Sequence, residues 1–147
     1  MISRLIIDLI EKRLGERARE YLIPPPVFET MGGEFLEFDS DAGCLKARFP
    51  VLEAQLNPYG SMQGGMVAAA IDNTLGPLSM LVAPPNVTRR LAVKYSRQAT
   101  REMGAIVVKA RFLERDGRWL RFQAEARDLD GRVVARTTAL HWVLDDE

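Results

Sequence analysis

The chain has 147 residues, which suits one folded domain, and its twenty basic and twenty acidic side chains give a formal net charge of zero. A neutral chain with mixed charges lacks the basic face that nucleic-acid-binding proteins carry, so we expect no nucleic-acid partner. The one cysteine, Cys44, cannot form an internal disulfide. Together with the single histidine, His141, it supplies too few ligands for a structural zinc site, and we expect no metal.

The N-terminal residues lack the basic start and the long apolar run of a signal peptide. No stretch approaches the ~18 apolar residues of a membrane span. These absences favour a soluble, cytoplasmic protein that does not act at a membrane.

Helical apolar spacing first appears over residues 3–21, and the three prolines 24–26 end this helix. A short helical piece over 27–31 follows. Residues 34–39 and 44–49 alternate apolar and polar side chains around a turn, which predicts a β-hairpin. After a loop rich in turn-forming residues, the longest helical pattern of the chain covers residues 64–81.

The remaining sequence predicts four strands over residues 89–98, 105–114, 118–128 and 132–144, arranged as an antiparallel meander. Asp-Gly pairs separate the last three strands, and this pair is a strong hairpin signal. A chain of six strands and one long helix is an α+β unit in which the helix covers one face of the sheet. We expect a single domain over residues 1–147.

The central helix has two contrasting sides. One is an apolar stripe facing the core, formed by Val67, Ala70, Ile71, Thr74, Leu78 and Leu81. Nearly opposite lies a narrow stripe of small side chains with one carboxylate, formed by Gly65, Ala69, Asp72, Gly76 and Ser79.

This second stripe supports two interpretations. The backbone N–H groups of Gly64 and Gly65 lie at the positive end of the helix and could bind an anion or a developing oxyanion, with Asp72 as a reactive carboxylate beside them. Alternatively, small residues on a helix form a close-packing face between subunits, and a Gly-Gly pair after a loop is a turn.

The segment from Asn57 to Gly76 resembles the signature of the phenylacetic-acid-pathway (PaaI-like) hotdog thioesterases. In that signature an Asn, a Gly and His-Gly-Gly precede a helix of small residues with an acidic residue. Here Asn57, Gly60, Gly64-Gly65 and Asp72 fall in register. Residues 91–99 look like the family strand that ends in Arg-Pro-Ala, with Gln98 in place of the proline. The resemblance covers about residues 33–144, and the helical extension 1–32 lies outside it.

The resemblance implies a hotdog fold, in which an antiparallel sheet wraps around the long helix. It also implies homodimers or dimers of dimers, with sites at the subunit interface, that hydrolyse acyl-CoA thioesters. By position, Asp72 would be the nucleophile or general base, the amides of Gly64 and Gly65 would polarise the carbonyl, and Asn57 would help to place the carbonyl or the water. No cofactor is implied, since coenzyme A is part of the substrate.

The main departure from the family pattern is Gln63, which stands where the family most often has His. Glutamine can donate a hydrogen bond to a carbonyl but cannot titrate near neutral pH. This substitution keeps a second hypothesis open, a non-catalytic acyl-CoA or acyl-ligand binding protein. A hotdog dehydratase is a third, although the catalytic His usual for such enzymes is missing from the corresponding region.

Several further residues are candidates for substrate contacts. Arg97, in a basic cluster around the third strand, would grip the phosphates of coenzyme A, although such a cluster is also typical of a solvated sheet face. His141, in the last strand, reads more readily as a packed residue than as a catalyst, and Cys44 has no nearby activating His. Aromatic and medium-chain aliphatic acyl groups both remain open. Residues that could line the acyl site or contact the substrate are Tyr59, Met62, Met66, Asn73 and Met80.

Overall fold

The computed structural model describes residues 2–144, so the first residue and the last three residues of the predicted domain lie outside the described residues. Its helices and strands follow one another in the predicted order. They are α1 (Ile2–Leu14), α2 (Pro26–Thr30), β1 (Glu34–Asp39), β2 (Cys44–Pro50), α3 (Gly64–Val82), β3 (Asn86–Tyr95), β4 (Ala105–Asp116), β5 (Trp119–Arg127) and β6 (Val133–Val143).

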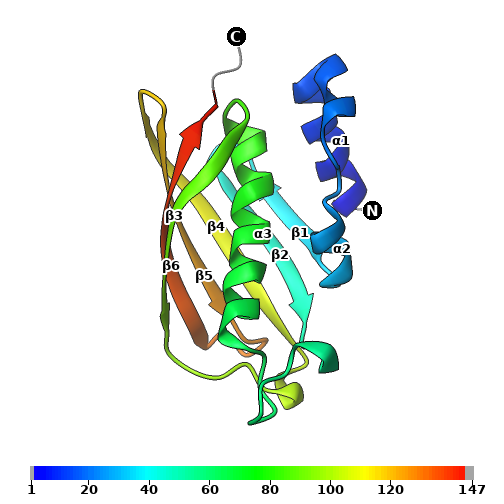
Figure 1. The fold of residues 1–147 in the computed structure, drawn as a ribbon, viewed down its shortest axis with the longest axis vertical. Coiled ribbons are helices and arrows are strands. Elements are labelled where there is room, and N and C mark those ends of the chain that lie inside the picture. The colour runs from blue at the N-terminus through cyan, green and yellow to red at the C-terminus, as the bar shows by residue number, and fades with distance from the viewer. Residues whose placement is uncertain (1, 145–147) are drawn as a thin grey trace.

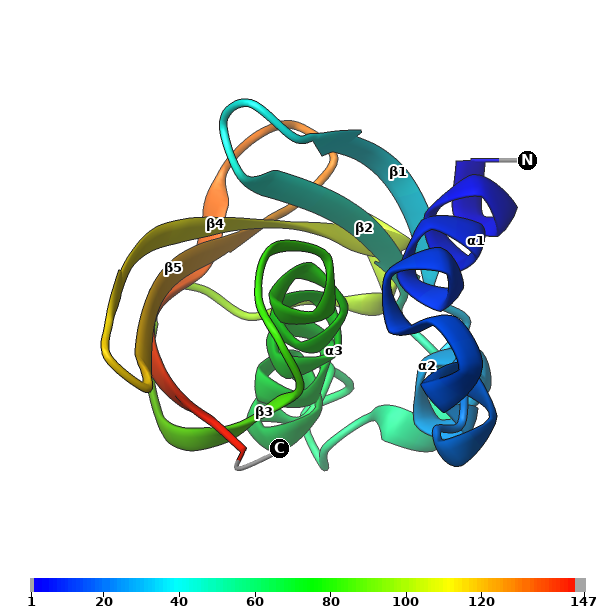
Figure 2. The same ribbon diagram turned by 90° about the horizontal axis from the view of Figure 1, so that it is seen from above.

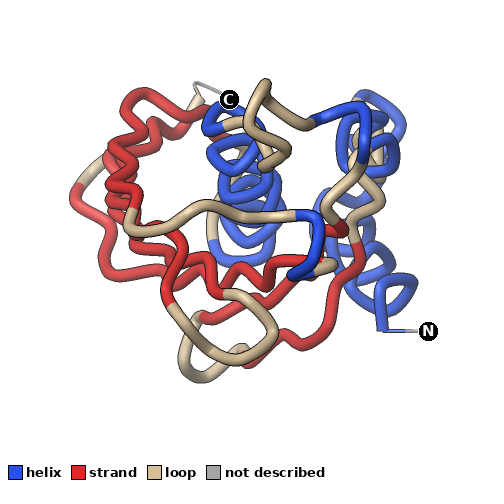
Figure 3. Tube along the Cα trace, turned by 90° about the horizontal axis from the view of Figure 1, so that it is seen from below, coloured by secondary structure: helices blue, strands red, loops and turns tan. Residues whose placement is uncertain are grey.

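The six strands form one antiparallel sheet in the order β1-β2-β4-β5-β6-β3. The sheet curls around α3, which lies against its concave face (Figures 1 and 2). Seen from below, the strands follow an arc with the helix inside it (Figure 3). The predicted α+β architecture of a sheet wrapped around one long helix is therefore confirmed.

The predicted four-stranded meander is wrong in one respect, because β3 pairs with β6 and not with β4. The meander includes only β4, β5 and β6, which the two Asp-Gly turns join. No such turn follows β3, and the longer connection over residues 96–104 leads the chain from one edge of the sheet to a strand beside β2. As a result, β3 is an edge strand.

The core lies between α3 and the inner face of the sheet. All six residues of the predicted core stripe of α3 are buried. In β5, the inward residues Leu120, Phe122, Ala124 and Ala126 are buried too and alternate with more exposed residues, as expected of a sheet with one face covered by a helix. The helix α3, with 19 residues, is long and apolar enough to cross a membrane. A helix at the core of a domain has the same length and composition.

The N-terminal helix is shorter than predicted. The α-helix ends at Leu14 because Gly15 takes a positive φ of 62°, and residues 15–20 continue as a 3-10 turn. Its side chains Ile6, Ile7 and Ile10 are buried in the core cluster of the domain. The extension also covers the β1 edge of the sheet (Figure 2), where the backbone N–H of Phe35 donates to Ser3 Oγ at 2.7 Å.

Candidate active site

The start of α3 offers unpaired backbone donors. Gln63 is the N-cap, and its carbonyl accepts the N–H groups of Met66 and Val67. The N–H groups of Gly64 and Gly65 lie in the first helical turn, which has no intrahelical acceptors for them. Gly65 is exposed, and a Cβ built on it would meet nothing within 4 Å. A ligand can therefore approach these amides closely.

Tyr95, the last residue of β3, holds this first turn in place. Its phenol donates to the carbonyl oxygen of Gly64 at 2.6 Å. A Cβ on Gly64 would lie 3.4 Å from the Tyr95 ring, an ordinary van der Waals contact, so the phenol packs directly over this first turn. Burial raises the pKa of Tyr95, which keeps the phenol protonated as a donor.

The loop before α3 is organised by Asn57. Its Oδ1 accepts the backbone N–H groups of Tyr59 at 2.9 Å and Ser61 at 3.1 Å. Gln98, which replaces the family proline, accepts a hydrogen bond from Ser61 Oγ at 3.0 Å. Asn57 therefore shapes the turn with its oxygen, while its Nδ2 is the group that remains to act on a ligand.

A second polar group of residues lies further along α3, around Asp72. The half-buried Asp72 accepts a hydrogen bond from Thr88 Oγ1 at 3.1 Å. The same Oγ1 lies 3.4 Å from Nε2 of His141, and Nδ1 of His141 lies 2.7 Å from Oδ1 of Asn86. A continuous row of contacts therefore runs through Asp72, Thr88, His141 and Asn86, from α3 across β3 and β6. We call these four residues the Asp72–Asn86 row.

Thr88 and Asn86 belong to the site although neither is among the residues predicted from the sequence. Thr88 is an ordinary threonine before two arginines, and Asn86 follows a Pro-Pro pair as a turn former would. No local pattern marks either residue, since their role comes from the pairing of β3 with β6. His141 is buried as expected, with 1% of its surface exposed, but it is also a member of the row.

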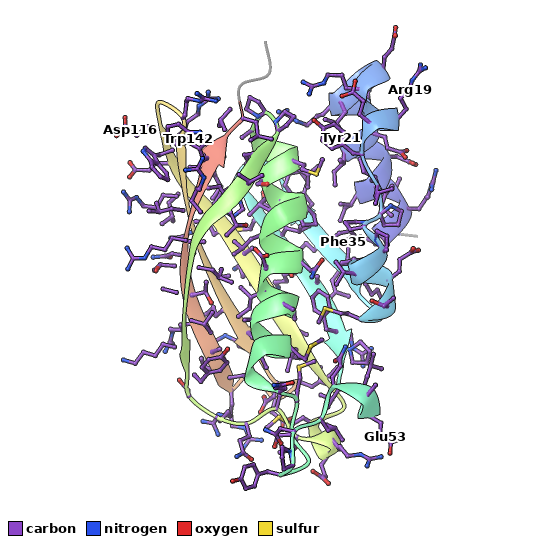
Figure 4. The ribbon with its side chains drawn as sticks, viewed as in Figure 1. Arg19, Tyr21, Phe35, Glu53, Asp116 and Trp142 are labelled. Atoms are coloured by element: carbon purple, nitrogen blue, oxygen red, sulfur yellow. The ribbon has the colours of Figure 1, made fainter. Side chains whose placement is uncertain are left out.

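Asp72 and His141 line a cavity of about 350 Å³ between α3 and the N-terminal extension. Tyr21 of the extension and Phe35 of β1, both labelled in Figure 4, also line this cavity. The rest of the wall is mostly apolar and includes Ile7, Ile10, Ile23, Pro24, Pro77 and Met80. A larger hollow of about 600 Å³ lies over the strands and contains none of the predicted site residues.

The predicted catalytic residues thus fall into two groups. Gln63, Gly64, Gly65 and Asn57 gather at the N-terminal end of α3, and the exposed side chain of Gln63 makes no cap hydrogen bond. Asp72 lies eight residues beyond Gly64, which corresponds to about 12 Å along the helix axis.

The predicted substrate contacts are scattered. Asn73 and Met80 line the cavity, whereas Met62 is 3% exposed within the core and Met66 is partly buried against it. Tyr59 is 84% exposed at a loop tip. Arg97, exposed just beyond β3, donates to the carbonyl oxygen of Val133 at 3.0 Å.

Comparisons with known proteins give similarity at the level of structure. No family model and no curated protein matches the chain. Among solved structures, a phenylacetic acid degradation-related protein of Ralstonia eutropha JMP134, provisionally designated a thioesterase, is 28% identical with a TM-score of 0.78. The match covers 92% of this chain and 98% of that one.

Two further structures share the fold at lower identity. A variant of the phenylacetic acid degradation protein PaaI from Thermus thermophilus is 20% identical, with a TM-score of 0.72, over 82% of this chain and all of that one (100%). A Streptococcus mutans protein bound to acetyl CoA is 18% identical, with a TM-score of 0.71, over 78% of this chain and 90% of that one. The chain therefore has the hotdog fold and, in both its sequence motif and its structure, resembles the PaaI-like thioesterases.

Proposed function

We propose that the protein hydrolyses an acyl-CoA thioester to a free acid and coenzyme A, with no metal or other cofactor. The hotdog thioesterase neighbours support thioester hydrolysis in general. The observation that carries the proposal for this chain is the position of Asp72, a half-buried carboxylate in the wall of an apolar cavity. A protein that only binds its ligand gains little from a carboxylate beside a thioester.

In the proposed reaction the carbonyl oxygen accepts hydrogen bonds from the amides of Gly64 and Gly65. These donors and the helix dipole stabilise the negative charge that develops on that oxygen. Asp72 acts as nucleophile or as general base for a water molecule. The Thr88 hydroxyl orients the carboxylate, and Asn57 Nδ2 and Gln63 help to place the carbonyl.

The site is proposed to be shared between two chains of a homodimer. Within one chain, the Gly64 amide and Asp72 are about 12 Å apart along α3 and are poorly placed to act on one carbonyl. β3 is an edge strand whose outer backbone groups are free to pair with a second copy. Antiparallel pairing of two β3 strands would set the Tyr95 end of one chain, with its Gly64, opposite the Thr88 end of the other.

The cavity beside Asp72 is proposed to hold the acyl group. Two of its polar side chains already use their donors within α3: Ser79 donates to the Gly76 carbonyl at 2.6 Å, and Asn73 Nδ2 donates to the Ala69 carbonyl at 2.8 Å. A hydroxyl or amino substituent on the acyl group would find few free partners there and would lose its hydration. We therefore expect an unsubstituted apolar acyl group, aliphatic or phenyl-type.

The test is free-thiol release from a panel of apolar and hydroxylated acyl-CoAs, with Asp72→Asn and Asp116→Asn in parallel. Asp116 lies at a hairpin tip (Figure 4) and serves as the matched control. We expect release by the wild type and by Asp116→Asn only. Equal release by Asp72→Asn would contradict the role of Asp72. Tight acyl-CoA binding without any release would support the binding-protein hypothesis that Gln63 keeps open.

Mixing two inactive variants tests the shared site. In a mixed dimer of Asp72→Asn and Gly64→Pro chains, one site would combine an intact helix start with an intact Asp72. About a quarter of the wild-type activity should therefore return after unfolding and refolding of an equal mixture. A site built within one chain would give no recovery.

A further inference from the structure

The single histidine of the chain is connected to Asp72 through one hydroxyl group. Thr88 Oγ1 lies 3.1 Å from Asp72 Oδ1 and 3.4 Å from His141 Nε2. His141 comes from β6, Thr88 from β3 and Asp72 from α3, so three elements converge on this contact.

The hydrogen bonds of Asn86 determine which ring nitrogen of His141 carries hydrogen. Asn86 Nδ2 donates to the Pro84 carbonyl at 2.8 Å, so Oδ1 is the atom that faces His141 Nδ1 at 2.7 Å. An amide oxygen only accepts, and Nδ1 must therefore be the donor. In the neutral ring, Nε2 then carries a lone pair directed at Thr88.

Thr88 thus lies between two acceptors but has one hydroxyl hydrogen. With an ionised Asp72 and a neutral His141, it can satisfy only one of them at a time. If the row gains one proton, both acceptors can be hydrogen-bonded at once, in either of two arrangements. Either protonated Asp72 donates to Thr88 and Thr88 donates to His141, or protonated His141 donates to Thr88 and Thr88 donates to Asp72.

These two arrangements hold the same number of protons and differ only in where the protons sit. We infer that His141 is a positioning residue that takes up, through Thr88, the proton that Asp72 removes from the attacking water. This inference rests on the proposed function, with Asp72 as the general base. It gives the chain a titrating group at the site although Gln63 occupies the usual histidine position.

The proton balance is simple. As the water oxygen bonds to the carbonyl carbon, one water hydrogen passes to Asp72. The Asp72 hydrogen then moves to Thr88 Oγ1 while the Thr88 hydrogen moves to His141 Nε2, which restores the carboxylate. When the carbon–sulfur bond breaks, its electron pair leaves with sulfur. The protons return along the row, and Asp72 protonates the thiolate.

The surroundings of His141 keep it neutral until that proton arrives. β5 packs the Phe122 ring against it at 4.7 Å between ring centroids, and β3 contributes the uncharged Thr88 and Asn86. Asp72, from α3, is the titratable group that faces it across this contact. Burial lowers the pKa of His141, and the negative charge of Asp72 opposes that shift.

Nuclear magnetic resonance of the ring nitrogens tests the connection without any assay of activity, because His141 is the only histidine. We expect the neutral ring to carry hydrogen on Nδ1. The pKa of His141 should fall further in Asp72→Asn, since the attracting charge is removed, and the Nε2 signal should shift in Thr88→Val. A neutral ring protonated on Nε2, or a pKa unchanged by Asp72→Asn, would overturn the inference.

Kinetics then separate proton uptake from a structural role. We expect His141→Gln to lower kcat about tenfold, with KM unchanged and with loss of the acid-side decrease in kcat that protonation of His141 should cause in the wild type. In a Thr88→Val background, His141→Gln should have no further effect. Thr138→Val, an exposed threonine on β6, is the control and should match the wild type.

The outcomes distinguish this inference from the proposed function. A lower kcat in His141→Gln with an unaltered pH profile would mean a structural role and would overturn the inference. If no acyl-CoA releases thiol but the histidine signal still responds to Asp72→Asn, the proposed hydrolysis is wrong while the connection between Asp72 and His141 is supported.

Discussion

Tyr95 donates its phenolic hydrogen to the carbonyl oxygen of Gly64 at 2.6 Å, which ties the end of β3 to the first turn of α3. At the other end of the same strand, Thr88 donates to Asp72. One edge strand therefore holds both the helix amides and the carboxylate. Since this strand is also the proposed dimer edge, subunit pairing and the geometry of the site depend on the same ten residues.

Removing the phenol should loosen the first turn of α3. In Tyr95→Phe the ring stays and one hydrogen bond is lost, worth about 1 kcal/mol. We expect kcat for thiol release to fall roughly fivefold, because the Gly64 and Gly65 amides become less well oriented. Thr138→Val is the control, since it also removes one hydroxyl group, from an exposed side chain on β6. Equal rates for the two variants would show that Tyr95 does not position the helix start.

Replacing Gly64 tests the backbone donor directly. Proline is well tolerated at the first helical position, and Gln63 before it has an extended backbone with ψ of 142°, as a residue before proline requires. Gly64→Pro removes the backbone N–H. Gly64→Ala adds the same Cβ but keeps the backbone N–H. We expect kcat to fall about 100-fold or more in Gly64→Pro and only a few-fold in Gly64→Ala.

The comparison requires that both variants fold. Circular dichroism and the unfolding midpoint of each should match the wild type within a few degrees. If the two variants lose activity equally while folded, crowding against Tyr95 is responsible, and the Gly64 amide is not the oxyanion donor.

Gln63→His restores the residue usual in the family. The side chain at this position is exposed and makes no cap hydrogen bond, so the substitution should not disturb the helix start. We expect kcat/KM to stay level or rise, whereas Gln63→Ala, which has no donor, should lower it about tenfold or less. A complete loss of thiol release in Gln63→His would mean that the site differs from that of the family.

Much of the fold could be predicted from local sequence. The alternation in residues 118–128, the Asp-Gly turns and the core stripe of α3 each depend on neighbours close in the chain, and all three are present in the structure. The position of β3 could not be predicted in this way, because nothing local distinguishes pairing with β6 from pairing with β4. The end of the N-terminal helix at Leu14 depends on the positive φ of Gly15, which the apolar spacing over residues 3–21 does not reveal.

The candidate site also contains one part that could be predicted from local sequence and one part that could not. Asp72 and the two glycines lie within one short motif, and the family resemblance identified them. The row from Asp72 to Asn86 brings together residues as far as 69 positions apart, from Asp72 to His141, through the register in which Thr88 faces His141. Such a register follows from packing of the whole sheet and not from any motif. His141 was correctly expected to be packed, but its contact with Thr88 needed the structure.

Gly76 offers a way to change the acyl preference. It lines the cavity, and a Cβ built on it meets nothing within 4 Å. A Cβ is therefore tolerated at this position, and the larger side chain of Gly76→Leu should fill part of the cavity. We expect kcat/KM for long or aromatic acyl-CoAs to fall at least tenfold while that for acetyl-CoA changes little. Met80→Leu, which conserves volume at the cavity wall, is the control. A uniform loss over all chain lengths would place the acyl group elsewhere.

The stability of the protein should depend on pH through His141. Burial lowers the pKa of this ring in the folded chain, so below a pH of about 6.5 the unfolded chain binds more protons than the folded one. Stability due to His141 is therefore fully present above that pH. This stability is lost as the pH falls from about 6.5 toward the pKa of His141 in the folded chain. Below that folded-state pKa, the stability no longer changes with pH through His141.

Urea unfolding of the wild type and His141→Gln at several pH values between 7.5 and 5 checks this expectation. The wild-type midpoint should decrease over this range more steeply than that of the variant, because carboxylate titration is common to both and only the wild type contains a histidine. Asp72→Asn should steepen the decrease, since the Asp72 charge favours the protonated ring. Parallel curves for wild type and His141→Gln would mean that folding does not alter the pKa of His141, and that the ring is solvated enough to charge freely beside Thr88.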